Sequence, residues 1–243
     1  MPERLYYTDA YLRAFDARVV DLADAGRRAY LDRTAFYPAS GGQPFDTGTL
    51  GAARVLDVVD EDSRIAHLLD RPLAAGPVSG AVDRPRSFDH MQQHTGQHLL
   101  SAVLAELCGG TTTSVHFGAA ASTLDLDLPA LEYDRVVAVE ARANALVTDN
   151  RPVSVSFEDA ATAAGLRKAS DREGTLRVVT IRDLDRSACG GTHVRATGDI
   201  GPIQIRKVER VRKQVRLEFL CGGRAVRRAR ADLDLLGRLA GPY

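Results

Sequence analysis

The sequence predicts an α+β fold in which a small, β-barrel-like N-terminal domain precedes a larger domain of mixed composition. Residues 1–82 contain short, partly alternating apolar segments broken by Gly, Pro and Asp, a pattern typical of strands and turns. Residues 90–222 instead combine two apolar stripes of helical period with strand-like segments. With 243 residues, of which 44% are hydrophobic and 26% charged, the chain has ordinary globular composition and is long enough for two modest cores.

The N-terminal domain is expected to be built from strands joined by tight turns. Its strand-like segments are residues 17–22, 28–37, 48–60 and 64–70. The segment 83–89, which carries a proline between charged residues, predicts a linker to the second domain.

The second domain is expected to open with a helix over residues 90–107, with Asp89 as its N-cap. Five apolar side chains recur there at helical spacing: Leu99, Leu100, Val103, Leu104 and Leu107. The segments expected to follow are a strand at 122–128, a second helix at 132–150, strands within 151–159, 175–185 and 202–222, and a basic C-terminal helix at 223–243.

His94 and His98 lie four residues apart at the head of the first helix. Because four residues are slightly more than one helical turn, both imidazoles leave the same face and can converge on one metal ion. The alternative is that they are polar residues on a solvated face. A spacing of this kind is half a zinc site, and it needs a second pair of donors elsewhere in the chain.

Cys189 and His193 provide such a pair. They are separated by two glycines and a threonine, so a tight turn rather than a helix is expected to fold them together. Taken alone, Cys189 has a buried position as the alternative, which is the commoner fate of a free cysteine. Together the two pairs offer three imidazoles and one thiol, a number and a chemistry that suit one tetrahedral Zn²⁺ per chain.

The two metal motifs, "HMQQHTGQHLLSA" and "CGGTHV", resemble those of the editing domain of alanyl-tRNA synthetases and of its free-standing relatives, the AlaX alanyl-tRNA editing proteins. The segments "AFYPASGGQPFDTGTL" and "GDIGPIQIRKVERVRKQVRLEF" are similar to the glycine-rich segment and the closing strands of that family. The resemblance implies a zinc-dependent hydrolase that acts in trans on the acceptor end of tRNA(Ala) mischarged with serine or glycine. No segment resembles an ATP-binding aminoacylation domain.

The resemblance also implies roles for residues outside the metal motifs. His116 matches a position beside the editing pocket, where it would orient water or contact the ribose, although a hydrogen-bonded strand histidine is the alternative. Thr95 would offer a hydroxyl to the substrate, or only bond its own helix. The backbone N–H groups of Gly190 and Gly191 would face the developing oxyanion, or serve the turn alone. The segment Gly41, Gly42 and Gln43 would approach the tRNA acceptor end, or form a simple turn.

The first metal motif reads His-Thr-Gly-Gln-His and lacks the glutamate that acts as general base in H-E-x-x-H metalloproteases. Peptide cleavage is therefore disfavoured, whereas a more labile aminoacyl ester can be hydrolysed by water activated or oriented at a metal site. Two alternatives stay open: a tRNA-binding module with a purely structural zinc, and an editing protein for another amino acid, because the Cys-Gly-Gly-Thr-His motif also resembles threonyl-tRNA synthetase editing regions.

Charge is distributed unevenly although the net charge is zero. Residues 205–230 carry ten Lys or Arg against two Glu, a local charge of +8. If the segment is extended, alternation places Arg206, Arg210, Arg212 and Arg216 on one face, where they would bind tRNA phosphates. The alternative is a solvated basic surface.

Several features point to a cytoplasmic protein. No apolar run approaches the ~18 residues that a membrane span needs, and the N-terminus lacks the apolar segment of a signal peptide. The three cysteines cannot all pair and are not spaced as a disulfide framework, which fits a reducing compartment. The chain is either complete or a fragment of a longer editing protein.

Overall fold

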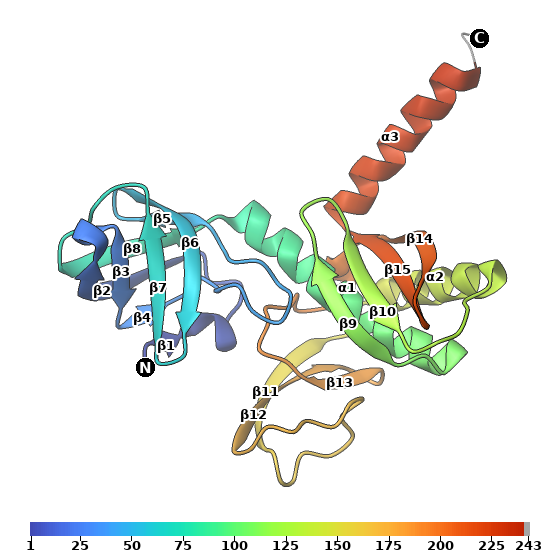
Figure 1. Cartoon of the computed structure of the whole chain (residues 1–243), viewed down its shortest axis with the longest axis horizontal. Helices are drawn as coiled ribbons and strands as arrows, with labels where there is room; N and C mark the ends of the chain where they lie inside the picture. Colours follow the sequence, from blue (N-terminus) through green and yellow to red (C-terminus); the bar gives the residue numbers. More distant parts are fainter. Residues whose placement is uncertain (241–243) are drawn as a thin grey trace. The chain divides into compact units, whose positions relative to one another are not determined.

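The computed structural model describes residues 1–240, which have mixed α+β structure (Figure 1). Contacts divide the chain into two compact units. The first comprises Met1–Met91 together with Cys189–His193, and the second comprises Gln92–Ala188 and the chain from Val194 onward. Each unit is described below by itself.

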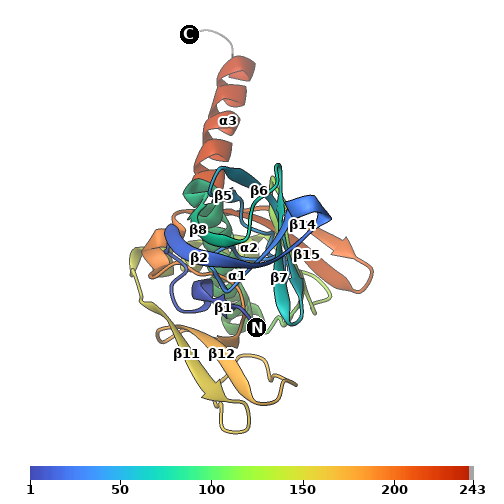
Figure 2. The same cartoon turned by 90° about the vertical axis from the view of Figure 1, so that its left-hand side faces the viewer.

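The first unit is built around six antiparallel strands whose hydrogen-bonded order, β2-β3-β7-β6-β5-β8, closes on itself through pairing of β8 with β2 (Figure 2). The strands are β2 (Ala14–Ala23), β3 (Arg28–Leu31), β5 (Gly48–Leu50), β6 (Ala53–Glu61), β7 (Arg64–Leu69) and β8 (Gly76–Val82). A parallel pair of two-residue strands, β1 (Glu3–Arg4) and β4 (Arg33–Thr34), and two 3₁₀ turns, Leu5–Tyr7 and Asp24–Gly26, complete the unit.

Alternation along the strands fills the interior of this ring. In β6, Ala53 and Val55 are buried whereas Arg54 and Leu56, which alternate with them, are exposed, the period-two pattern of a strand with one face on a core. The core also contains Phe15, Phe36, Leu50 and Ile65. All four strand-like segments that the sequence predicted for this domain contain strands of the ring.

The linker predicted at 83–89 is wrong, because helix α1 (Arg84–Cys108) already begins there. Pro85 lies in the first turn, where its missing N–H would have had no partner in the helix and its fixed φ fits helical geometry. The N-cap is Asp83 rather than Asp89: its side chain accepts a hydrogen bond from Arg86 N–H at 3.5 Å, and its carbonyl accepts one from Ser87 N–H at 3.0 Å.

The second unit contains the rest of α1, helix α2 (Tyr133–Thr148), helix α3 (Gly223–Ala240) and two sheets. The four-stranded sheet has the order β14-β15-β10-β9 and the three-stranded sheet the order β11-β12-β13. The strands are β9 (Thr112–Phe117), β10 (Ser122–Leu126), β11 (Val153–Asp159), β12 (Thr175–Ile181), β13 (Asp185–Ala188), β14 (Ile203–Val211) and β15 (Gln214–Cys221), with a 3₁₀ turn at Thr197–Ile200. Figure 2 shows β11 and β12 side by side as an antiparallel pair.

Helix α1 packs tightly within this unit. Its predicted apolar positions Leu99, Leu100, Val103 and Leu104 are fully buried. Gly96, between the two histidines, allows helix α1 to approach β15 closely, because a Cβ at this position would lie 2.3 Å from Cys221 Sγ. The buried Gln93 amide also exchanges two hydrogen bonds of 3.0 Å with the backbone of Cys221. These contacts set the position of the histidine-bearing turn against the sheet.

Strands β14 and β15 form a hairpin, so the predicted arginine face is wrong. Arg212 lies in the turn with a φ of 58°, and a bulge interrupts β14 between Ile205 and Lys207. Cross-strand pairing places Arg216 opposite Glu209, whereas Arg210 pairs with the buried Val215 on the other face. The bulge and the turn therefore each interrupt the alternation of side chains on which the predicted face depends.

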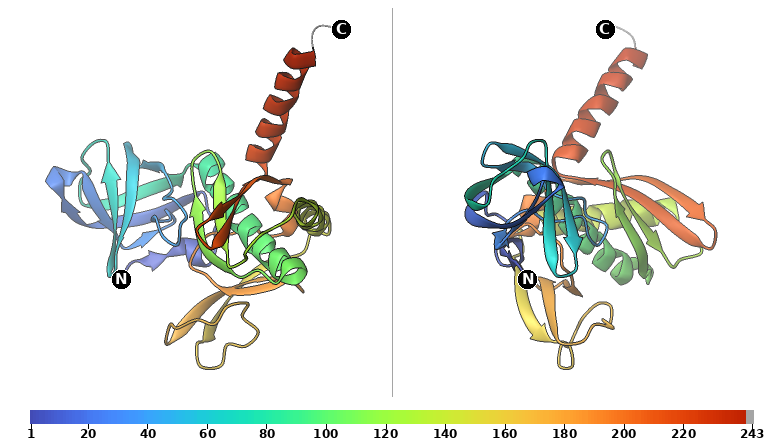
Figure 3. Two further views of the ribbon diagram at one scale, coloured as in Figure 1. Left: turned by 45° about the vertical axis from the view of Figure 1, so that its right-hand side comes forward. Right: turned by 60° about the vertical axis from the view of Figure 1, so that its left-hand side comes forward.

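Helix α3 follows β15 and, within the second unit, has few neighbours beyond its first turn (Figures 1 and 3). Arg224 and Ala225 are buried, whereas four leucines along the helix are more than half exposed: Leu233, Leu235, Leu236 and Leu239. The helix predicted for 223–243 is present as far as Ala240, and 241–243 lie outside the described residues. No helix among residues 1–240 is both long and apolar enough to cross a membrane.

Candidate metal centre and adjoining pocket

His94 and His98 lie one turn apart on α1, each 4% exposed, with ring centroids 5.3 Å apart. The His94 ring packs against Phe117 of β9 at a centroid distance of 4.9 Å. His98 Nδ1 lies 3.1 Å from Asp185 Oδ2, which leaves Nε2 as the ring nitrogen suited to a metal. The predicted helical pair is thus on one face, and one of its rings has a fixed orientation.

Asp185 is the residue at this site that the sequence did not single out. It is 4% exposed, and its carboxylate also accepts hydrogen bonds from Arg167 Nε at 2.6 Å and Ser187 Oγ at 2.9 Å. Burial acts to raise the pKa of Asp185, but the hydrogen bond with His98 and the charge of Arg167 outweigh it and lower the pKa below its usual value. The one signal in the sequence was an acidic residue shortly before Cys189.

The segment Cys189–His193 is irregular, as its two glycines predicted. Cys189 Sγ lies 3.4 Å from His193 Nε2, and Gly191 N–H donates a hydrogen bond of 3.4 Å to the same sulfur. The Gly191 N–H is therefore directed at the sulfur, where it favours a thiolate. Gly190, adjoining Cys189, is half-buried.

Gln43 anchors this segment within the first unit. Its Nε2 donates to Thr192 Oγ1 at 2.8 Å and its Oε1 accepts from Thr192 N–H at 3.1 Å. Gln43 and Thr192 are each 1% exposed. The preceding glycines, Gly41 and Gly42, have φ values of 56° and 83° and form the exposed turn that presents Gln43. Of the predicted tRNA-binding segment, Gln43 is therefore structural, and only the two glycines are open to a ligand.

Thr95 holds the chain on the other side of His193. The threonine is fully buried, and its Oγ1 accepts a hydrogen bond of 3.1 Å from Val194 N–H. This contact fixes the residue directly after His193 against the helix that carries His94 and His98. Thr95 thus supports a metal-ligand segment, a role that the sequence did not suggest.

His94, His98, Cys189 and His193 form one group whose potential ligand atoms all lie within 4.8 Å of one another. Three imidazoles and one thiol are donors that suit zinc and other borderline-soft ions. The hydrogen bonds to His98 and to Cys189 further match the outer-shell support that metal ligands have in proteins. The predicted donor set can therefore hold a metal ion.

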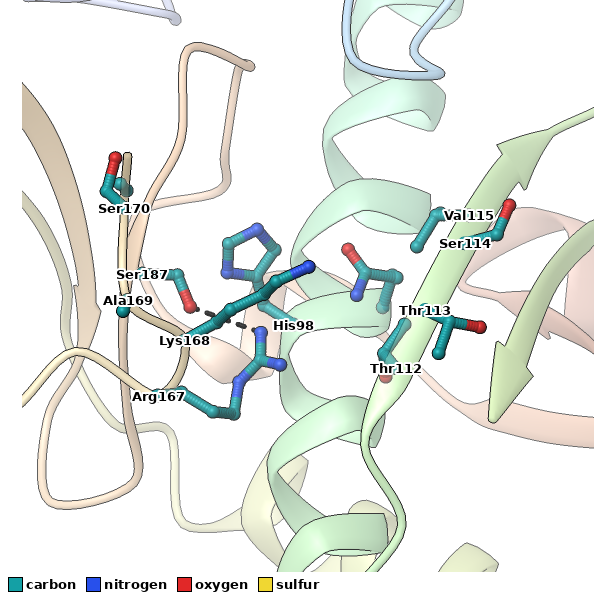
Figure 4. Close-up of a pocket in the computed structure, with 12 residues that line it drawn as sticks. His98, Thr112, Thr113, Ser114, Val115, Arg167, Lys168, Ala169, Ser170 and Ser187 are labelled. Atoms are coloured by element: carbon teal, nitrogen blue, oxygen red, sulfur yellow. Dashed lines mark hydrogen bonds between the residues drawn. The ribbon is translucent and has the colours of Figure 1, made fainter. Parts of the chain in front are cut away.

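A cavity of about 290 Å³ opens beside His98 in the second unit (Figure 4). Its wall is rich in hydroxyl groups and carries two cations, and it consists of Gln97, His98, Thr112, Thr113, Ser114, Val115, Arg167, Lys168, Ala169, Ser170, Ser187 and Ala188. Gln97 Nε2 donates to Ser101 Oγ at 2.8 Å, and that hydroxyl bonds Thr112 Oγ1 at 2.7 Å. The cavity thus joins a candidate metal ligand to a polar, hydrogen-bonding wall.

His116 is not brought into this site. It is exposed on β9, where it pairs with Thr123, and alternation places it on the opposite face from Phe117, which contacts His94. The strand position explains the difference, because a shift of one residue along a strand reverses the direction of the side chain.

The predicted phosphate-binding arginines are also partly committed to carboxylates. Arg216 makes a bidentate pair with Asp125, with nitrogen–oxygen distances of 2.7 and 2.8 Å, and Arg206 lies 2.7 Å from Asp232. Such pairs reduce the positive charge that this part of the sheet offers to a phosphate.

Comparison with known proteins places this site in a family. The family model described as "Threonyl and Alanyl tRNA synthetase second additional domain" matches residues 176–217. The chain is 36% identical over 241 residues to alanyl-tRNA editing protein Aarsd1 of Mus musculus, covering 90% of this chain and 58% of the relative. It is 34% identical over 241 residues to alanyl-tRNA editing protein AlaX-L of Pyrococcus horikoshii, covering 93% and 59%.

A third relative is covered nearly end to end. Alanyl-tRNA editing protein AlaX-M of Methanosarcina acetivorans is 36% identical over 231 residues, which are 86% of this chain and 94% of the relative. The chain spans little more than half the length of Aarsd1 and AlaX-L. The coverage of AlaX-M, together with the His, His, Cys and His group, shows that this chain belongs to the family of alanyl-tRNA editing proteins.

Proposed function

We propose that this chain hydrolyses the ester bond of tRNA(Ala) mischarged with serine or glycine, acting in trans and in the cytoplasm. The observation that carries the proposal is the polar cavity of about 290 Å³ directly beside His98. A zinc site that only stabilised a fold would not require a hydrogen-bonding cavity along one of its ligands. The family names support tRNA as the partner, because the relatives are called alanyl-tRNA editing proteins.

Zinc is the metal we propose for His94, His98, Cys189 and His193. A bound zinc ion would supply Lewis acidity that polarises an ester carbonyl or activates water near neutral pH. The chain itself holds the donors in place: Asp185 orients His98, the Gly191 N–H supports the Cys189 sulfur, and the segment around His193 is fixed by its neighbours.

The cavity supports a small, polar aminoacyl group as the part of the substrate that enters it. Its volume lies near the lower end of the roughly 300–1,000 Å³ range of ligand pockets. Side-chain hydroxyls of Thr112, Ser170 and Ser187 can exchange hydrogen bonds with the serine hydroxyl and the substrate ammonium group. A wall that pairs with the serine hydroxyl favours the seryl ester over the alanyl ester, so correctly attached alanine would be spared.

The positive charge at the mouth of the cavity favours the binding of a nucleic acid there. Lys168 is exposed at the cavity and adds a positive charge that would attract phosphates near the 3′ end of tRNA. Arg167 is held by Asp185 and Ser187 and contributes mainly to the wall. The exposed Gly41 and Gly42 remain our candidates for backbone contact with the acceptor end.

A tRNA-binding module with structural zinc is the second candidate, and the count of four protein donors favours it, because a filled shell is typical of structural sites. The two candidates differ in their products: only the editing enzyme releases free amino acid. They also differ in the role of Gln97. The editing enzyme would use its amide in the cavity, whereas a binding module with structural zinc has no turnover that this amide could affect.

The test is deacylation of Ser-, Gly- and Ala-tRNA(Ala) by zinc-loaded and chelator-treated protein. We expect fast release of serine or glycine, slow release of alanine, and loss of activity on chelation. Gln97→Met, which keeps size but removes the amide, should lower kcat/KM for the mischarged tRNA with zinc content unchanged, whereas His116→Ala on the outer sheet face should retain activity. Equal rates on all three substrates would contradict editing, and tRNA binding without any deacylation would favour the structural-zinc module.

A further inference from the structure

A second cavity of about 700 Å³ lies at the base of α3, within the second unit. It is formed by the loop between β9 and β10, by residues of the β14–β15 hairpin, and by the first turns of α3. Its lining contains five cations and a single acid, and it consists of Ala119, Ala120, Ala121, Arg206, Lys207, Glu218, Leu220, Arg224, Arg227 and Arg228. No element of the proposed deacylation site belongs to it.

The frame of this basic pocket is a built structure. Arg224 is 7% exposed, and its Nη1 donates a hydrogen bond of 2.6 Å to the carbonyl of Gly118. This bond ties the β9–β10 loop to the start of α3. The loop then continues as three alanines, whose small side chains leave the volume beside the arginines open.

The positive charge of the basic pocket is only partly neutralised. Arg206 and Arg228 share one carboxylate, that of Asp232, at 2.7 and 2.9 Å, and Lys207 is paired with Glu209. Arg227 is exposed and has no ion pair within the described part of the chain. Because two arginines share one acid, the pocket has an excess of cations.

The position of these arginines on α3 is unfavourable for the helix by itself. Arg224 lies in the first turn, where the positive end of the helix dipole repels cations most strongly, and Arg227 and Arg228 follow in the second turn. No acidic residue occupies the first turn. An anion held among the arginines would be attracted both by their charges and by the helix end, and would remove this repulsion.

We propose that the basic pocket binds phosphodiester groups of the tRNA backbone. Guanidinium groups suit phosphate oxygens because they donate planar pairs of hydrogen bonds. The lining contains no aromatic side chain on which a base could stack, so the pocket is suited to the backbone and not to base readout. The identity of the nucleic acid as tRNA rests on the proposed function. The pocket therefore adds affinity that does not depend on the attached amino acid.

The experiment is titration of uncharged tRNA(Ala) with the zinc-loaded full chain across a salt series, followed by fluorescence anisotropy. Arg227→Ala should reduce the slope of log affinity against log salt by roughly 0.7–0.9, and adding Arg228→Ala should roughly double that change. Arg227→Lys, which keeps the charge, should restore most of the slope. Arg238→Ala is the matched control, because this arginine lies on the same helix but outside the pocket.

A second measurement separates this proposal from the proposed function. Seryl-adenosine carries the ester but no backbone phosphate, so its hydrolysis should be equal in wild type and in the Arg227→Ala/Arg228→Ala variant, while KM for Ser-tRNA(Ala) rises in the variant. Wild-type protein that hydrolyses neither ester would contradict the deacylase, and the salt slope would still test the pocket. An unchanged slope in the double variant, or an equal loss in Arg238→Ala, would overturn phosphate binding by this pocket.

Discussion

The Asp185 carboxylate contacts His98 at Nδ1, with Oδ2 3.1 Å from that nitrogen, and so leaves Nε2 to the candidate metal position. Arg167 and Ser187 hold the same carboxylate from its other sides. A hydrogen bond from Nδ1–H fixes the tautomer with a free Nε2 lone pair and raises the basicity of that nitrogen. The position of one metal donor thus depends on a residue that would not itself touch the metal.

Asp185→Asn should therefore weaken metal binding by about 10–100-fold, because an amide holds the ring less strongly and can present its NH₂ group to Nδ1. Competition with a chromogenic chelator measures this affinity. Glu158→Gln is a suitable control: Glu158 pairs with Arg186 at 2.8 Å in the same sheet and has no contact with the metal group. Equal metal affinity in Asp185→Asn and wild type would show that Asp185 serves only the packing around Arg167.

Gln43→Ala should destabilise the segment Cys189–His193. Removing the amide leaves Thr192 N–H without its partner in a region that is 1% exposed, which costs about 1–3 kcal/mol. We expect a lower free energy of unfolding and faster loss of metal to a chelator. Ser40→Ala, in the same turn but exposed, should change neither quantity. Unchanged metal release in Gln43→Ala would mean that the segment is held by its other contacts.

The four metal donors could be predicted from the sequence because their spacing is local. Helical periodicity brings His94 and His98 together, and two glycines allow Cys189 and His193 to turn toward each other. Their supports could not be predicted, since Gln43 is 149 residues from Thr192 and Asp185 is 87 residues from His98. Nothing in the local sequence encodes such distant pairs.

The errors in the fold also have physical reasons. Pro85 lies between charged residues, a pattern that predicts a linker, but in a first turn proline lacks only an N–H that would have no helical partner. The face predicted for the arginines at 206–216 requires an extended chain throughout, but Arg212 adopts a positive φ in a tight turn. Period-two alternation predicts a face only within an uninterrupted strand.

His67 should make the first unit less stable in acid. It is fully buried, with Nδ1 3.2 Å from the Ala29 carbonyl and Nε2 2.9 Å from Thr34 Oγ1, an environment that satisfies the neutral ring. Burial lowers the pKa of His67 from 6.5 to about 4. Between these two values the unfolded chain binds a proton that the folded chain does not, so the free energy of unfolding falls as pH falls from about 6.5 to 4.

The full effect on the free energy of unfolding is up to about 3 kcal/mol, at about 1.36 kcal/mol per pKa unit. Denaturant unfolding between pH 4.5 and 7.5 measures it, with metal-free protein so that metal release cannot contribute. His67→Gln should be less stable at neutral pH but should show a smaller dependence on pH. The exposed His116, replaced by Gln, should leave the pH dependence as in wild type. A slope that His67→Gln does not change would assign the acid sensitivity to other groups.

Arg216→Ala should lower stability and leave tRNA binding largely unchanged, the reverse of the result expected for Arg227→Ala. Asp125 is 8% exposed and depends on the bidentate pair with Arg216, which lowers the pKa of Asp125. Removing the arginine leaves a mostly buried carboxylate without its partner, at a cost of about 1–3 kcal/mol. Arg216→Lys should recover part of this stability but not the bidentate geometry.

Chemical denaturation and the salt slope of tRNA affinity, measured on both variants, separate the two roles. A reduced salt slope with unchanged stability in Arg216→Ala would assign Arg216 to the phosphate-binding surface after all.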